Sequence, residues 1–351
     1  MKKIAIFVVV LCLLLPTVAF GCGQGGSGSA GVVHVHNWGE YIDESIFDIF
    51  QEETGIRVNY STFETNEALY SLLRRGGSNI DVIIPSDYMI ARMIDEDMLE
   101  ELDFSNIPNF SLIDERYKGL GYDPNNRFSV AYMTGTVGII YNSSLISEPI
   151  TSWGALFNSN FAGQILMFDN PRDAFGIALK YLGYSLNTVN EDEIREAFDV
   201  LVQQRPILQA YVMDQIFDKL EGGEAWLGPY YAGDYLAMAE NNPDLMFARP
   251  VEGTNFFVDA MCIPKGAENK TNAEIFINFM SRTDIALMNM EYIFYASANF
   301  EAAEIFKEEI DPDDYAVMFA SYDVLANSEV FNHLPRNILE LYDELWVELK
   351  R

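Results

Sequence analysis

The fold is decided by residues 32–84, which read VVHVHNWGEYIDESIFDIFQEETGIRVNYSTFETNEALYSLLRRGGSNIDVII. Apolar and polar residues alternate at 32–37 and 56–60, which predicts two strands, and the apolar run at 81–84 predicts a third. The segments between them, 43–55 and 64–75, have the apolar spacing of helices, and each ends at a glycine. Strands that alternate with helices in this way predict an α/β fold with an open, largely parallel sheet.

The rest of the chain continues this alternation. We expect strands at 129–141, 164–168, 225–227 and 256–263, and helices at 153–157, 171–181, 190–204, 233–240 and 335–350. In open sheets of this kind, ligands bind beyond the carboxyl ends of the strands. Trp38 and Ser86 directly follow two predicted strands, so we expect both side chains at the binding edge.

The first residues predict export. Two lysines precede an apolar run at 4–15 that is too short to cross a bilayer, so we interpret residues 1–21 as a signal peptide. Small residues around Cys22 predict that this cysteine is lipidated, and residues 22–31 form a Gly/Ser-rich tether. We therefore expect a periplasmic or otherwise extracytoplasmic protein, anchored by lipid to a bacterial membrane. The alternative is that Cys22 is an ordinary small residue near a cleavage site.

The chain is strongly acidic. Its 351 residues include 22 Lys and Arg against 53 Asp and Glu, a formal net charge of −31. Such a charge disfavours binding to nucleic acid and attracts cations. Of the three cysteines, Cys262 alone would remain with a free side chain after processing, so no disulfide is expected. His34 and His36 share a predicted strand without a third ligand nearby, and we expect neither a metal site nor a cofactor.

Aromatic and acidic residues lie near many of the predicted strand ends and helix starts. Carboxylates bind ammonium groups, and ring faces attract cations and pack on methylenes, so this combination suits a small, flexible polycation. Asp259 is the most informative, because it stands in an apolar strand where an unpaired carboxylate is costly. Helix caps and core rings are the alternative interpretations. The candidate residues are Trp38, Tyr41, Ser86, Tyr88, Asp173, Tyr231, Asp234, Phe257, Asp259 and Tyr295.

Six stretches occur in an order and spacing typical of one protein family: NWGEY (37–41), ETGIRV (53–58), YSTFETNE (60–67), DVIIPSDY (81–88), TSW (151–153) and FVDA (257–260). Together they resemble the spermidine/putrescine-binding proteins of bacterial ABC uptake systems. The resemblance extends from residue 32 to the C-terminus. It implies a two-lobe periplasmic-binding-protein fold of type II, with lobe 1 at 32–136 and 261–322, lobe 2 at 137–260 and 323–351, and the ligand between them.

The resemblance also implies roles for single residues. Asp259 matches an aspartate that grips an amine, and Asp173 matches a glutamate that takes another amine. Asp234 stands where putrescine-preferring members have aspartate. Gly39 replaces a hydroxyl residue of the family. Two more residues complete the predicted ligand-binding site: Glu40 and Asn332, the latter near a family glutamine.

The predicted function is that of a receptor and not of an enzyme, since no Gly-x-Ser-x-Gly nucleophile motif is present. We expect a polyamine ligand, with putrescine favoured over spermidine because Asp234 is present and position 257 is Phe and not Trp. The expected partners are the permease subunits of an ABC transporter, and the receptor is expected to be a monomer. Two alternatives stay open: a ferric-ion receptor that uses Tyr230 and Tyr231, and an adhesin or sensor without transport.

Overall fold

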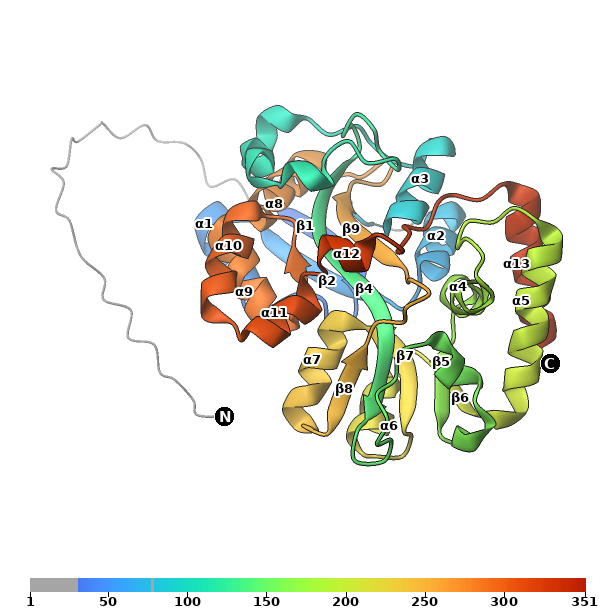
Figure 1. Cartoon of the computed structure of the whole chain (residues 1–351). Helices are drawn as coiled ribbons and strands as arrows, with labels where there is room; N and C mark the ends of the chain where they lie inside the picture. Colours follow the sequence, from blue (N-terminus) through green and yellow to red (C-terminus); the bar gives the residue numbers. More distant parts are fainter. Residues whose placement is uncertain (1–30, 77–78) are drawn as a thin grey trace, which may run out of the picture. The chain divides into compact units, whose positions relative to one another are not determined.

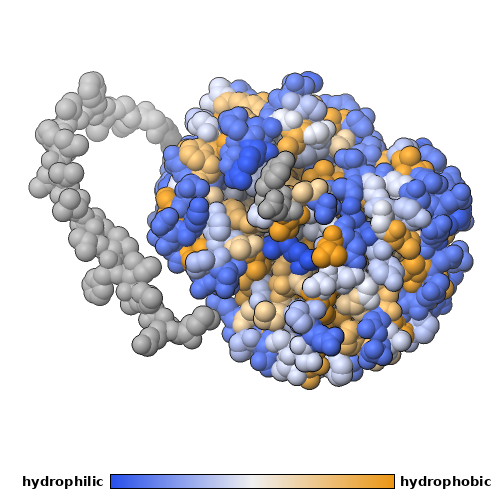
Figure 2. Space-filling model, in the orientation of Figure 1, coloured by the Kyte–Doolittle hydropathy of each residue, from blue (hydrophilic) through white to orange (hydrophobic). Residues whose placement is uncertain are grey.

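The computed structural model describes residues 31–76 and 79–351 of the chain. The predicted signal peptide, Cys22 and residues 22–30 of the tether lie outside the described residues. In the described part of the chain, no helix combines the length and the apolar character that crossing a membrane requires. Hydrophilic residues cover much of the face seen in Figure 2, as the acidic composition predicts.

The first sheet has the strand order β2-β1-β3-β9-β4. β1 runs parallel to β2 and β3, whereas β9 lies antiparallel between β3 and β4. The short strand β10 pairs with β4. The bounds are β1 Val32–Trp38, β2 Arg57–Phe63, β3 Val82–Ile83, β4 Ser129–Asn142, β9 Phe256–Cys262 and β10 Ala296–Ser297.

The second sheet shares β4 with the first and has the order β4-β7-β5-β6, with β8 also on β4. β4 has 14 residues. Residues 129–136 of this strand pair with β9, and residues 137–141 pair with β7, so one continuous strand belongs to both sheets (Figure 1). The other bounds are β5 Ile165–Phe168, β6 Leu208–Val212, β7 Leu227–Tyr231 and β8 Leu245–Ala248.

Two glycines of β4 lie beneath aromatic rings at the point where the strand passes between the sheets. A Cβ atom on Gly135 would lie 2.6 Å from the ring of Phe257, and one on Gly138 would lie 2.3 Å from the ring of Phe247. No side chain fits at these distances, so glycine is required for both rings to pack on the strand.

Helices cover both faces of the first sheet, and each face has its own hydrophobic core. Val35 and Phe276 belong to the core beneath α1, α8 and α9, whereas Ile83 and Met89 belong to the core beneath α2 and α3. The helices of this part are α1 Ile46–Thr54, α2 Asn66–Arg75, α3 Asp87–Asp95, α8 Lys270–Met280, α9 Thr283–Ile293, α10 Phe300–Glu309, α11 Pro312–Met318 and α12 Tyr322–Leu325.

The second sheet has a separate core that includes the fully buried Trp153, Phe168 and Phe175. The C-terminal helix α13 packs on α4 and α5 (Figure 1). The helices of this part are α4 Pro171–Leu182, α5 Glu191–Gln204, α6 Ile216–Glu221, α7 Ala232–Asn241 and α13 Arg336–Leu349, and 3-10 turns include Trp153–Phe157.

The α/β class is confirmed, and most predicted elements occur within a few residues of their expected bounds. β6 and β8 were not predicted, and β7 begins at Leu227 and continues past the expected strand at 225–227. The predicted lobe boundary at residue 260 falls inside β9, a strand that pairs with the first sheet along its length. The division into two lobes that close on a ligand stays a prediction.

Candidate functional site

A cavity of about 420 Å³ lies where strand ends of both sheets meet. Its lining comes from the ends of β1, β2, β6 and β7, from β9, and from the first turns of α2, α3, α4 and α7. Among the described residues that line it, eight are Asp or Glu and none is Lys, Arg or His. A cavity with these walls is suited to a cation, because nothing in its lining offsets the carboxylates.

The structure brings eleven of the twelve predicted ligand-binding residues to this cavity: Trp38, Glu40, Tyr41, Ser86, Tyr88, Asp173, Tyr231, Asp234, Phe257, Asp259 and Tyr295. Asn332 is not brought to it. Its side chain is exposed, and its backbone N–H donates to Asn187 Oδ1. The neighbouring Phe331 is buried and lines the cavity, because consecutive side chains of this extended segment point to opposite sides.

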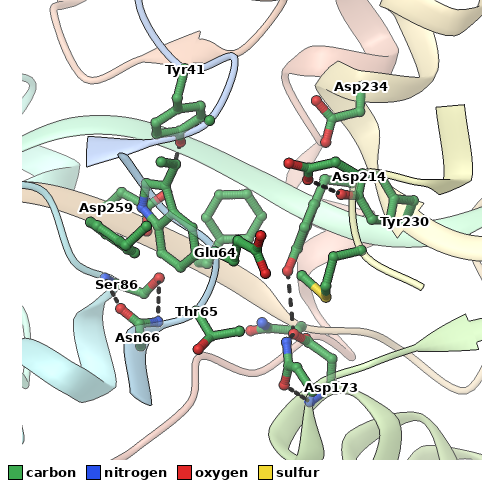
Figure 3. Close-up of a pocket in the computed structure, with 18 of the residues that line it drawn as sticks. Tyr41, Glu64, Thr65, Asn66, Ser86, Asp173, Asp214, Tyr230, Asp234 and Asp259 are labelled. Atoms are coloured by element: carbon green, nitrogen blue, oxygen red, sulfur yellow. Dashed lines mark hydrogen bonds between the residues drawn. The ribbon is translucent and has the colours of Figure 1, made fainter. Parts of the chain in front are cut away.

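Five carboxylates around the cavity each accept a hydrogen bond from a tyrosine hydroxyl, and we call these the carboxylate–tyrosine pairs. The O–O distances run from 2.7 Å to 3.3 Å. Three of the pairs, at Asp259, Asp173 and Asp214, are drawn with dashed lines in Figure 3. The pairs are Asp259 with Tyr41, Asp173 with Tyr231, Asp234 with Tyr295, Asp214 with Tyr230, and Glu67 with Tyr88.

Asp259 is the most deeply buried carboxylate of the predicted set, with 4% of its surface exposed. Oδ2 accepts a hydrogen bond of 2.7 Å from the Tyr41 hydroxyl. Oδ1 is buried and has no hydrogen-bond partner among the described residues. A buried carboxylate with an oxygen that lacks a donor is costly, so a cation close to this side chain would be favourable.

Helix starts hold three of the other carboxylates. Asp87, Asp173 and Asp234 lie in the first turns of α3, α4 and α7. The N-terminus of a helix carries a partial positive charge, which favours a carboxylate there. Asp87 also accepts backbone N–H groups from Tyr88 and Val258, at 2.7 Å and 3.1 Å.

Burial dominates the proton affinity of these groups. It raises the pKa of Asp234 to about 7, and it raises the pKa values of Asp173 and Asp259 to about 6. The pKa of Asp87 rises to about 8 for the same reason. The ligand-free cavity therefore holds several carboxyls that titrate near neutrality, and a bound cation would favour their ionised forms.

Aromatic rings form the remaining walls. Trp38 packs on Phe63 with a centroid distance of 4.5 Å, and its indole N–H donates to the Ile84 carbonyl at 2.8 Å. These two contacts fix the ring at the end of β1. Tyr231 meets the edge of Phe257 at 5.5 Å on the opposite sheet. Rigid rings on both sides offer apolar faces to the methylenes of a ligand.

Sequence reasoning did not assign four carboxylates of the lining: Glu64, Glu67, Asp87 and Asp214. Asp87 follows Ser86 and lies in the first turn of α3, where the Ser86 side chain makes no capping hydrogen bond. Its position directly after a strand-ending Pro85-Ser86 was a usable signal. Asp214 follows β6, a strand that was not predicted, so the sequence offered no reason to place it at a strand end.

The hydroxyls of Tyr230 and Tyr231 donate to Asp214 and Asp173. Burial raises the pKa of both phenols well above their usual range, which disfavours the phenolate form that a ferric ion would bind. In residues 31–76 and 79–351, no three His, Cys, Asp or Glu side chains are grouped to hold a metal ion.

Comparison with known proteins identifies the family of this chain. Residues 45–317 match the model of the bacterial extracellular solute-binding protein family. The spermidine/putrescine-binding periplasmic protein of Escherichia coli is 31% identical over 336 residues, which cover 95% of each chain.

Two solved structures share the fold. One, from Listeria monocytogenes and assigned to a spermidine/putrescine ABC transporter, is 37% identical with a TM-score of 0.86, over 91% of this chain and 99% of that one. A lipoprotein of Treponema pallidum is 25% identical with a TM-score of 0.80, over 91% and 99%. The predicted periplasmic-binding-protein fold is confirmed, and the family is one of solute-binding proteins and not of enzymes. The chain belongs to the bacterial extracellular solute-binding proteins and, within them, to the spermidine/putrescine-binding periplasmic protein family.

Proposed function

We propose that this protein is the receptor of an ABC uptake system and captures a polyamine in the acidic cavity for delivery to the membrane permease. The relatives named for spermidine and putrescine binding support the ligand class. The cavity supports it independently, because its lining has eight carboxylates and no basic residue among those described. A ligand that is positively charged and largely apolar between its charges fits such walls.

The single observation that carries the proposal is the buried Asp259 carboxylate, whose Oδ1 has no donor among the described residues. An ammonium group would supply that donor and neutralise the charge. Asp234 lies on another side of the same cavity and would hold a second ammonium group, and Asp173 adds a further negative charge to the lining (Figure 3). Trp38 and Phe257 would contact the methylenes between the charges.

We extend the proposal to a preference for putrescine over spermidine. Asp234 occupies the position of the aspartate in putrescine-preferring family members, and Phe257 is smaller than the tryptophan of other members. We also propose that the receptor acts as a monomer, outside the cytoplasm, held to the membrane by a lipid on Cys22. A lipoprotein among the structural relatives is consistent with such an anchor.

Calorimetric titration with putrescine and spermidine, after removal of carried-over ligand, tests the ligand class. The Asp259→Asn variant should bind at least about 100-fold more weakly, because a hydrogen bond between charged groups is lost in a buried site. Asp123→Asn is the matched control, since Asp123 is 3% exposed and accepts its hydrogen bonds outside the cavity. Wild-type affinity in Asp259→Asn, or no polyamine binding by the native protein, would refute the proposal.

A further inference from the structure

Asp214 reaches from the second sheet to the loop that follows β1. It comes after β6 and lines the cavity together with Gly39. A Cβ atom on Gly39 would lie 3.3 Å from Asp214 Oδ2, which is closer than nearly all such contacts. A side chain at position 39 would therefore require the Asp214 carboxylate to shift by a few tenths of an ångström. The family resemblance implies a hydroxyl residue at position 39. This chain has Gly39 there instead, and the Asp214 carboxylate lies beside it.

The Asp214 side chain is held in this position by the second sheet. Tyr230, which is 2% exposed, donates a hydrogen bond of 3.0 Å to Oδ1. The bond to Oδ1 leaves Oδ2 on the side of Gly39 and the cavity. Helix capping does not explain the residue, because α6 has no side-chain capping hydrogen bond.

Asp214 and Asp234 lie on the same side of the cavity (Figure 3). Tyr295 donates to Asp234 Oδ2 at 2.8 Å, so each carboxylate has one oxygen bound to a tyrosine hydroxyl. Burial raises the pKa of Asp234, and the negative charge of Asp214 raises it further. Two neighbouring carboxylates repel one another, and a cation placed between them would remove that repulsion.

We propose that Asp214 and Asp234 together bind one terminal ammonium group of the ligand, and that Asp214 depends on the absence of a side chain at Gly39. This inference rests on the proposed polyamine function and adds a binding residue to it. A primary ammonium has three N–H donors, so one group can donate to both carboxylates at once. Asp259 lines the same cavity, and its carboxylate is available to the other charge of the ligand.

The first test is calorimetric titration of the purified protein with putrescine for wild type, Asp214→Asn and Asp218→Asn. Asp214→Asn retains an oxygen for Tyr230 and should weaken binding by about 10-fold, because one charged acceptor is lost. Asp218 is exposed on α6, which begins two residues after Asp214, and does not line the cavity, so its variant has the same change in net charge and should bind as wild type. Equal affinity of Asp214→Asn and wild type would overturn the inference.

The second test uses the contact between Gly39 and Asp214. Gly39→Ser should weaken putrescine binding in the native background, where it crowds Oδ2. The same substitution should improve binding in the Asp214→Ser background, where the space is empty and a hydroxyl is returned to position 39. An effect of the same sign and size in both backgrounds would overturn the inference, since it would show that the two positions act independently.

These measurements distinguish a failure of polyamine binding from a failure of the role of Asp214. A native protein that binds no polyamine refutes the proposed function. A native protein that binds putrescine, with Asp214→Asn unchanged, refutes only the role of Asp214. Thermal unfolding of each ligand-free variant shows whether a loss of binding is a loss of folding, and Asp214→Ser is titrated in place of Asp214→Asn if the latter does not fold.

Discussion

Asp234→Asn should make the ligand-free receptor more stable while it weakens ligand binding. The Asp234 carboxyl has an ordinary pKa of 3.8, and burial raises the pKa in the folded protein to about 7. The folded state therefore holds this proton more tightly than the unfolded state does. As pH rises from about 4 to about 7, the free energy of unfolding falls because the buried carboxyl must ionise. Above that range, ionisation of this group causes no further decrease.

The size of the effect follows from the two pKa values. The full loss in the free energy of unfolding amounts to roughly 4 kcal/mol at pH 8, and only about 2 kcal/mol of it has developed at pH 5. Asparagine carries no charge and still offers an oxygen to the Tyr295 hydroxyl, so the variant should avoid most of this loss. For a chain of this length, a gain of about 4 kcal/mol raises the Tm by roughly 6 °C.

Thermal unfolding of the ligand-free proteins at pH 5 and pH 8, with and without putrescine, measures these quantities. The advantage of the variant should be larger at pH 8 than at pH 5. Saturating putrescine should reverse the order, because the ligand stabilises only a protein that binds it. Asp199→Asn, on the exposed side of α5, makes the same change in net charge and serves as the control. A variant that is no more stable than wild type at pH 8 would refute the reasoning.

Putrescine binding near pH 6 should release protons, because Asp173 and Asp259 have pKa values of about 6 in the empty cavity. Calorimetric titration in buffers of different ionisation enthalpy measures this release. Identical heats in all buffers would contradict the prediction. Arg172→Met should shift the pH dependence of binding upward. Arg172 is 4% exposed, and its guanidinium carbon lies 4.5 Å from the Phe331 ring centroid. Its positive charge lowers the pKa of Asp173, whereas burial raises it. An unchanged pH profile in the variant would exclude this effect of Arg172 on Asp173. Thr65→Ala should cost about 1 kcal/mol in denaturant unfolding, because the Thr65 hydroxyl caps α2 through Ala68 N–H, whereas Thr65→Ser should be close to wild type.

The order of elements could be predicted from the sequence because local signals agreed with the fold. The alternation at 32–37 became β1, and Gly183 ends α4 in a left-handed conformation as its position after the apolar pattern indicated. Helix starts were less certain. The helix predicted at 43–55 begins at Ile46, and the Asp43 carboxylate accepts from Ser45 N–H.

The candidate site was predictable where a residue stood beside a strong strand. Trp38, Ser86 and Asp259 follow or lie within such strands, and all three line the cavity. Asp214 was not predictable, because β6 is short and mostly half-buried and gives no clear apolar alternation. Its contact with Gly39 joins residues far apart in the chain, and no local pattern records such a contact.

The position of β9 also determines when the first sheet can be completed during synthesis. β9 lies between β3 and β4, although it follows β4 by more than a hundred residues in the chain. A nascent chain that has reached residue 142 contains β1 to β4 but leaves β3 and β4 with unpaired inner edges, which are open to incorrect pairing. Contacts between distant segments form slowly, because a long loop must close first. The last third of the chain, and not the first, therefore sets the time at which this sheet closes.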